Sequence, residues 1–210
     1  MKIQVTGETL ERMKLMDLPD MPDKKVLVPQ YNPSKFFLYQ DPINGIFDKQ
    51  VKDHFALNYK EFALKLGEAA KESVPYGYVY DLLSKLCDVL AYKVDLGVRL
   101  RKFYKEGNKQ GLQSIIDVDV KTILTKIEIF RKAVRLQWNK ENKQTGYDVL
   151  DGRLGYLSNR IETTQILIEE YLTGKIEKIE ELEVEVLPFN GYDYEICWNW
   201  WMATVTTHNL

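Results

Sequence analysis

Four long stretches of this chain carry apolar residues at alternating intervals of three and four, and this spacing constrains the fold more than any other feature. It places the apolar side chains on one face of an α-helix. The stretches run from residue 48 to the break at 75, from 79 to 106, from 111 to 139 and from 153 to 174. The sequence therefore predicts a mainly α fold: an antiparallel helical bundle of about four main helices, with short connections at Pro75, Gly107 and Gly146.

Four details of this pattern can be checked against a structure. The second helix is expected to be continuous over about 27 residues, or roughly 40 Å. Trp138 belongs to the core-facing side of the third helix, and Gln165 is the one polar residue on the apolar face of the fourth. After Gly174, residues 175–182 keep a helical spacing and predict a short acidic helix.

The N-terminal part lacks this regularity. Five of the seven prolines fall within residues 1–47, which favours an irregular strap laid over a helical body. Within the strap, residues 35–48 are dense in apolar side chains and should be buried. We therefore expect residues 1–47 to form the strap, 48–187 the bundle, and 188–210 an aromatic tail packed on it.

Composition excludes several classes of function. Lys and Arg number 29 against 31 Asp and Glu, so no basic field would attract nucleic acid or an anionic membrane. Cys87 and Cys197 do not resemble a secreted disulfide framework, and together with His54 and His208 they show no metal-ligand spacing. We expect no cofactor, no metal and no membrane span, and a cytoplasmic location.

The segment from Trp138 to Arg160 carries more than a bend between two helices requires. Its contact candidates are Trp138, Asn142, Tyr147 and Arg153. One interpretation is corner packing with solvated charges; the other is a docking surface, because arginine makes bidentate contacts to carboxylates. Arg153 is expected in the first turn of the fourth helix, where a cation is disfavoured. Its partner would be Asp148 or Asp151 within the bend, or a carboxylate of another domain.

The C-terminal tail places Trp198, Trp200 and Trp201 within four residues. Indole faces suit the C–H face of a sugar, so these residues are carbohydrate candidates. Alternating Tyr and Trp also favour an aromatic strand that docks on the bundle or on a neighbouring domain. Both interpretations stay open.

Two blocks, residues 35–48 (KFFLYQDPINGIFD) and the Trp138–Arg160 segment with its Asp151-Gly152-Arg153-Leu154-Gly155 run, resemble the C-terminal region of bacterial family 20 glycoside hydrolases. The resemblance covers nearly the whole chain and implies a helical domain that follows a TIM barrel in exo-acting β-N-acetylhexosaminidases. Residues 1–47 would then correspond to the exit from the barrel.

The family's reaction uses an adjacent Asp-Glu pair, and this sequence contains no Asp-Glu dipeptide. No catalytic residue is therefore assigned. The resemblance implies a non-catalytic accessory domain whose partner is a catalytic barrel in the same polypeptide or in a separate chain, with an N-acetylhexosamine-containing sugar as the candidate ligand. The alternatives are a helical protein-interaction module unrelated to sugar chemistry, or a small carbohydrate-binding domain that uses the tryptophan-rich tail. A homodimer is also left open.

Overall fold

The structure is a computed structural model that describes residues 33–186. The aromatic tail and most of the expected strap lie outside the described residues. The described elements are α2 (Pro33–Tyr39), the short 3₁₀ turn η1 (Asp48–Gln50), α3 (Phe55–Glu72), α4 (Gly77–Lys93), α5 (Leu96–Lys105), α6 (Lys109–Ser114), the π-helical segment η2 (Ile115–Val120), α7 (Lys121–Glu141), α8 (Tyr147–Leu172) and α9 (Glu180–Glu183). The expected mainly α class is confirmed, with four long helices and no strand among residues 33–186.

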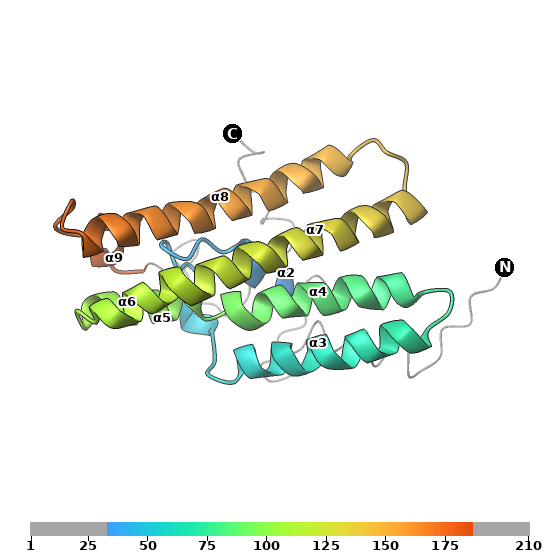
Figure 1. Cartoon of the computed structure of the whole chain (residues 1–210), viewed down its shortest axis with the longest axis horizontal. Helices are drawn as coiled ribbons and strands as arrows, with labels where there is room; N and C mark the ends of the chain where they lie inside the picture. The colour runs from blue at the N-terminus through green and yellow to red at the C-terminus, as the bar shows by residue number, and fades with distance from the viewer. Residues whose placement is uncertain (1–32, 187–210) are drawn as a thin grey trace, which may run out of the picture.

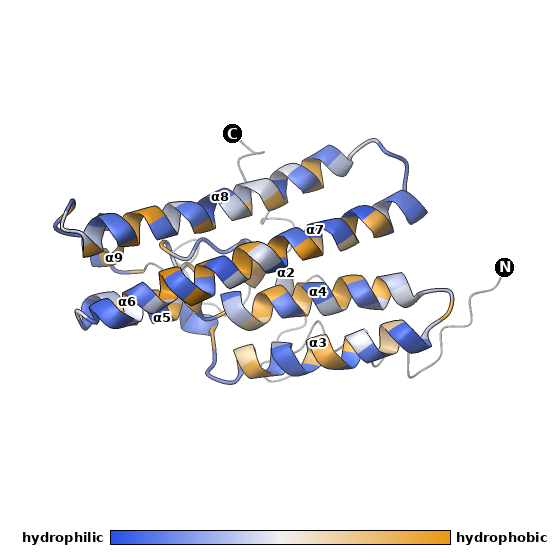
Figure 2. Ribbon diagram, in the orientation of Figure 1, coloured by the Kyte–Doolittle hydropathy of each residue, from blue (hydrophilic) through white to orange (hydrophobic). Residues whose placement is uncertain are grey.

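The four long helices lie side by side in the order α3, α4, α7, α8, each antiparallel to its neighbour (Figure 1). The most extensive packing joins α3 to α4 and α4 to α7. The short α2 lies behind this layer and packs on α4. Each long helix shows hydrophobic and hydrophilic stripes, as the periodicity predicted, and the connection between α7 and α8 is hydrophilic (Figure 2).

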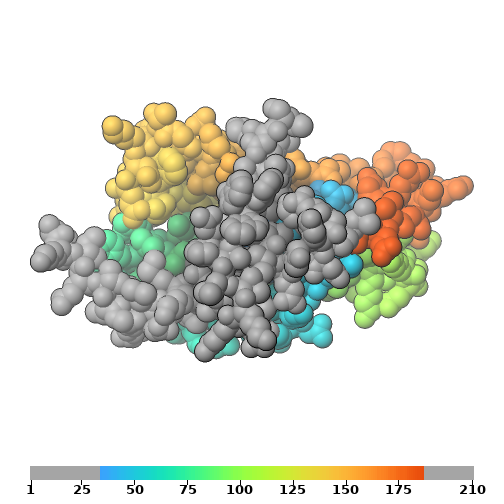
Figure 3. Space-filling model, turned by 180° about the vertical axis from the view of Figure 1, so that it is seen from behind, coloured from blue at the N-terminus to red at the C-terminus, as the bar shows by residue number. Residues whose placement is uncertain are grey.

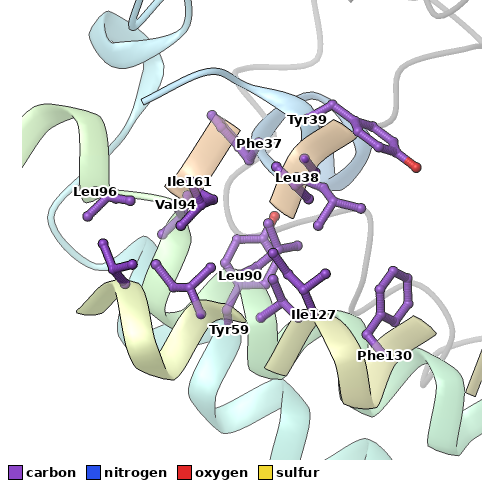
Figure 4. Close-up of a cluster of buried hydrophobic side chains, with 14 of the residues drawn as sticks. Phe37, Leu38, Tyr39, Tyr59, Leu90, Val94, Leu96, Ile127, Phe130 and Ile161 are labelled. Carbon is purple, nitrogen blue, oxygen red and sulfur yellow. The ribbon is translucent and has the colours of Figure 1, made fainter. Parts of the chain in front are cut away.

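The core forms where α2 meets the layer of long helices. Figure 4 shows side chains from α2 facing those of α3, α4, α7 and α8 in one cluster. Tyr59 is fully buried there, and its hydroxyl lies 3.2 Å from that of Ser34. The apolar residues of α2 and of the loop after it are buried, as expected for residues 35–48, except Ile46, which is exposed. Residues 33–39 form a helix, however, within the segment for which we expected no regular structure.

The expected second helix is two helices, because the chain turns at Val94 and Asp95. No proline or glycine stands at either position, and the apolar spacing continues through the turn. The turn brings Gly97 of α5 against the loop after α2: a Cβ at Gly97 would lie 2.9 Å from the carbonyl oxygen of Pro42. Tertiary packing against this loop therefore outweighs the local helical pattern.

The third expected helix is also divided. It begins at Lys109 and includes six π-helical residues, Ile115–Val120, before α7 starts. A π-helical segment shifts the phase of the side chains that follow it. Within this segment Asp119 accepts two hydrogen bonds from Arg99 of α5, at 2.8 and 2.9 Å, so the segment is tied to the neighbouring helix.

The fourth helix begins six residues earlier than expected, at Tyr147, after Gly146 adopts a left-handed conformation with φ of 96°. The polar residue on its buried face is Thr164, whose hydroxyl donates to the carbonyl of Arg160, and Gln165 is only half-buried. The expected acidic helix at 175–182 is reduced to the four residues of α9. Likewise, the first long helix starts at Phe55, because residues 48–50 form the separate turn η1.

Candidate functional site

The bend between α7 and α8 is short, and its aromatic residues pack on each other. The rings of Trp138 and Tyr147 lie 6.0 Å apart, and the indole N–H of Trp138 donates to the carbonyl of Lys143 at 2.7 Å. Asn142 is exposed and ends α7. Trp138 is half-buried, at the edge of the core. These contacts fit the corner-packing interpretation of the two aromatic residues.

The acid of the bend that makes a strong contact is Asp151, but its partner is Arg131 of α7. Arg131 Nε and Asp151 Oδ1 are 2.6 Å apart, and Tyr147 also donates to this carboxylate. The guanidinium holds the pKa of the Asp151 carboxyl below its usual value. The ion pair therefore joins α7 to α8 beside the bend.

Arg153 is paired with neither acid that we expected. It lies in the second turn of α8 because the helix starts early, and Asp151 is occupied by Arg131. Its Nε is enclosed and has no hydrogen-bond partner among the described residues. Instead, its charge acts on two residues of α2. Burial lowers the pKa of Lys35, and the charge of Arg153 lowers it further. Burial raises the pKa of Tyr39, and the charge of Arg153 opposes that rise. The expected internal partner of Arg153 was wrong.

Replacing Arg131 with Ala should lower the melting temperature of the chain by about 2–4 °C, since a partly exposed ion pair contributes at most ~1 kcal/mol. Replacing Arg153 with Ala should leave it unchanged, because the described residues offer Arg153 no acidic partner. Differential scanning calorimetry of both variants checks this. A lower melting temperature for Arg153→Ala alone would contradict the assignment of Asp151 to Arg131.

The remaining site candidates, Trp198, Trp200 and Trp201, lie outside the described residues. Their two interpretations, sugar stacking and docking of an aromatic strand, stay predictions.

The sequence analysis missed a second feature, which we call the buried polar cluster: Gln40, Asp41, Asp48, Lys93, Arg101 and Arg160. It surrounds the loop that follows α2. Lys93 is only 3% exposed, and its amine donates to the carbonyl oxygens of Phe37 and Gln40 at 3.0 and 2.6 Å. The ammonium thus satisfies the backbone acceptors at the C-terminal end of α2, which the helix leaves without intrahelical donors.

Other members of the cluster fix the rest of the loop. Arg160 of α8 binds the carboxylate of Asp41 at 2.5 Å. Gln40 donates to Asp48 at 2.5 Å across the loop. Arg101 of α5 donates to the carbonyl of Ile43 at 2.8 Å. Helices α4, α5 and α8 therefore hold residues 40–48 from three sides.

Arg101 also extends the contact to the end of the described chain. It donates to the carbonyls of Leu182 and Val184 at 3.1 and 3.2 Å. Seen from behind, the residues around α9 lie beside α5 and α6 (Figure 3). The loop after α2 and the segment after α8 are thus held by the same guanidinium.

Burial shifts two pKa values within the cluster. It lowers the pKa of Lys93 to about 7, although the charges of Asp41 and Asp48 act in the opposite direction. Burial raises the pKa of Asp48 to about 6, and Arg101, the bond from Gln40 and Lys93 oppose that rise. Both residues therefore carry a charge that the protein interior disfavours.

These shifts predict an unusual pH dependence of stability. The folded chain releases the proton of Lys93 near pH 7, whereas the unfolded chain keeps it up to about pH 10.5. The unfolded state therefore binds more protons between these values, and the free energy of unfolding rises with pH above about 7. The folded chain keeps the proton of Asp48 up to about pH 6, whereas the unfolded chain keeps it only to about pH 3.8. The folded state therefore binds more protons between these values, and the free energy of unfolding falls as the pH rises through them.

We therefore expect the wild type to lose stability relative to Asp48→Asn between pH 4 and 6. Relative to Lys93→Met, we expect the free energy of unfolding of the wild type to increase between pH 7 and 9, by on the order of 1 kcal/mol per pH unit. Urea unfolding at each pH measures both differences. Differences that stay constant with pH would show that neither group titrates abnormally.

The signal that could have revealed the cluster is the sequence Gln40-Asp41-Pro42-Ile43-Asn44-Gly45-Ile46-Phe47-Asp48, in which two acids and two amides interrupt an apolar segment. Polar groups in such a segment need buried partners. The partners are Lys93 of α4, Arg101 of α5 and Arg160 of α8. Each is at least 45 positions from the loop along the chain, so no local pattern identifies them.

The fold and the cluster define a helical domain in which α2 and the loop after it are enclosed by the longer helices. A family model described as the Glycoside Hydrolase 20C C-terminal domain matches residues 11–196. The chain belongs to this family, and the resemblance seen in its sequence is confirmed.

Among curated proteins, the chain is similar to one from Encephalitozoon cuniculi (strain GB-M1) that is named a probable serine/threonine-protein phosphatase. The two are 28% identical over 156 residues, which make up 71% of this chain and 33% of that protein. The chain therefore spans about a third of the length of the curated relative it matches.

Two further observations concern residues 33–186 alone. No helix there combines the length and the apolar character needed to cross a bilayer. No three of the His, Cys, Asp and Glu side chains there are grouped in a way that could hold a metal ion.

Proposed function

We propose that this chain is a non-catalytic helical accessory domain of a family 20 exo-β-N-acetylhexosaminidase. It supports the catalytic barrel, which is present in the same polypeptide or in a separate chain of the same cytoplasm. The match to the C-terminal domain of the family supports this role. The absence of an Asp-Glu dipeptide from the sequence agrees with it, since the family's reaction depends on that pair.

The buried polar cluster is the observation that carries the proposal. Domains joined by an ordinary linker move relative to each other by default. Here the segment that enters the domain is not an ordinary linker: α2 is packed in the core, and Lys93, Arg101 and Arg160 hold the loop after it. A barrel of this enzyme would therefore meet a helical body in which α2 and the loop after it are firmly held.

The proposal implies that the pure chain does not hydrolyse glycosides. Incubation with p-nitrophenyl N-acetyl-β-D-glucosaminide should release no p-nitrophenol above the uncatalysed rate, because the sequence lacks the adjacent Asp-Glu pair on which the family's reaction depends. Release that saturates with substrate would overturn the accessory role.

The positive test uses the barrel of the same enzyme. The open reading frame around this chain, or its genomic neighbour, identifies a barrel with an Asp-Glu pair. That barrel is then heated with and without an excess of this chain, and its residual hexosaminidase activity is followed with time. We expect the chain to lengthen the half-life of the activity by mass action, and the chain carrying Lys93→Met to lengthen it less. Equal half-lives with and without the wild-type chain would contradict the proposal.

A further inference from the structure

Two buried oxygen atoms in the loop after α2 have no hydrogen-bond donor among the described residues: Oε1 of Gln40 and Oδ2 of Asp48. The same two side chains are already joined by one hydrogen bond, from Gln40 Nε2 to Asp48 Oδ1 at 2.5 Å. Gln40 is only 6% exposed. The backbones of Gly45 and Gly97 close on the Asp48 carboxyl, because a Cβ at Gly97 would lie 2.8 Å from Oδ1 and a Cβ at Gly45 would overlap with Oδ2. Each member of this enclosed pair therefore leaves one oxygen unsatisfied.

Both unsatisfied atoms are acceptors while Asp48 is ionised, so neither can satisfy the other. A protonated carboxyl adds one O–H donor. A carboxylic acid and a carboxamide can then form two parallel hydrogen bonds, in which the amide N–H donates to one carboxyl oxygen and the carboxyl O–H donates to the amide oxygen. The bond from Gln40 Nε2 is the first of these two. One proton on Asp48 Oδ2 would supply the second and satisfy both atoms.

The cations around Asp48 do not supply the missing donor. Lys93 of α4 and Arg101 of α5 direct their hydrogen bonds to backbone carbonyls, and Arg160 of α8 binds Asp41. Burial raises the pKa of Asp48 to about 6, although the neighbouring cations oppose the rise. The chemistry of the unsatisfied atoms and the effect of burial thus agree that the carboxyl favours its neutral form.

Asp48 can exchange its proton with solvent, because it lines a pocket of about 620 Å³. The other charged groups of this pocket belong to η1, to α5 and to the segment around α9: Lys49, Arg101, Lys102, Lys105, Glu183 and Glu185. The four cations favour a charged carboxyl, and the two acids act in the opposite direction. The proton is therefore held by enclosure and hydrogen bonding against the prevailing charge of the pocket.

We propose that Asp48 holds a proton in the folded chain and forms a two-bond pair with the carboxamide of Gln40, so that the loop after α2 is a latch that protonation closes. Helices α4, α5 and α8 hold the same loop, and Arg101 ties it to the segment around α9. Loss of the proton removes one of the two bonds and leaves an enclosed charge, so the loop opens more readily as the pH rises. This inference does not depend on the proposed function.

The competing arrangement is an ion pair, in which a charged Asp48 approaches the Nε of Arg101, an enclosed atom that also lacks a partner. Asp48→Asn distinguishes the two. Asparagine has the shape of the acid and can likewise donate to Gln40 Oε1 while it accepts from Nε2, so it should mimic the protonated form at every pH. In an ion pair, the same change would remove the charge on which the contact depends.

Urea unfolding and amide hydrogen exchange of the full 210-residue chain test the inference. At pH 6.5, Asp48→Asn should unfold at the same urea concentration as the wild type or a higher one. Asp48→Leu should unfold at a lower one, because it leaves both ends of the Gln40 amide unpaired. The backbone amides of Gly45 and Asp48 donate within the loop, so their exchange reports its opening. Their protection in the wild type relative to Asp48→Asn should fall by up to about tenfold per pH unit between pH 4 and 6.

The matched control is Asp53→Asn, which removes an exposed carboxyl just before α3. It should change the protection of the same amides by less than about twofold at either pH, as is usual for a surface substitution.

Carbon-13 NMR reads the proton directly. The carboxyl resonance of Asp48 should titrate with a midpoint near pH 6, well above its ordinary value of 3.8. A midpoint at or below 3.8 would show that the folded chain holds Asp48 as an anion and would overturn the inference. An Asp48→Asn variant that does not fold, or that unfolds at lower urea than the wild type at pH 6.5, would also overturn it. If the relative protection of the loop amides stays constant with pH, the proton does not close the latch.

Discussion

Replacing Lys93 with Met should lower the free energy of unfolding of this chain by about 3 kcal/mol at pH 8. At this pH Lys93, whose pKa burial lowers to about 7, is mainly a neutral amine, which still donates to the backbone carbonyls of Phe37 and Gln40; both acceptors are enclosed by the core. Methionine fills a similar volume but leaves both carbonyls without a donor. Helix α2 should then detach first, so its backbone amides should exchange with deuterium faster than those of α4 and α7.

The control for this prediction is Lys85→Met on the same helix. Lys85 is partly exposed and forms only an i,i+4 pair with Asp81, at 3.5 Å, so its loss should change stability by no more than about 0.5 kcal/mol. Buried charges can also be replaced by apolar residues without loss when every polar partner is removed with them. A Lys93→Met variant as stable as the wild type would therefore show that the hydrogen bonds of Lys93 do not anchor α2.

Replacing Gly97 with Ala should destabilise the chain by about 1–3 kcal/mol, which is typical of an added methyl group in a packed interior. The new Cβ would lie 2.8 Å from a carboxylate oxygen of Asp48 and 2.9 Å from the backbone oxygen of Pro42. The carboxylate can move, but the backbone oxygen belongs to a loop held by Arg101 and Arg160. Helix α5 would have to move away from the loop.

Gly155→Ala is the matched control, because it makes the same chemical change within a helix at a position with nothing within 4 Å. There the helix propensity of alanine should stabilise the chain by up to about 1 kcal/mol. Urea denaturation of the two variants should thus give changes of opposite sign. Equal changes in the two would mean that the close approach of Gly97 to the loop has no energetic consequence.

Much of this fold could be predicted from the sequence, because amphipathic helices are encoded locally. The stripes that include Tyr59, Leu90, Ile127 and Ile161 all face the core. The sequence did not reveal the turn at Val94–Asp95 or the π-helical segment. Both depend on contacts between elements: Gly97 against the loop after α2, and Asp119 against Arg99.

The candidate site was predicted less well, for the same reason. The residue types at the bend suggested that Arg153 pairs with Asp148 or Asp151, and this was wrong: Arg131, 20 positions before Asp151, binds Asp151 instead. Arg153 instead acts on α2, where its charge adds to the larger effect of burial in lowering the pKa of Lys35. The buried polar cluster joins residues up to 119 positions apart, so it appears only when the helices are packed.

The most direct test of this account is whether the chain binds a family 20 catalytic barrel at all. Calorimetric titration of the pure 210-residue chain with the barrel of the same enzyme, at low micromolar concentration and physiological salt, gives the answer. The account predicts a saturable complex with one chain per barrel, accompanied by a negative heat-capacity change from the apolar surface that is buried. Titrations that show no binding heat at two temperatures, together with separate elution of the two proteins, would contradict it.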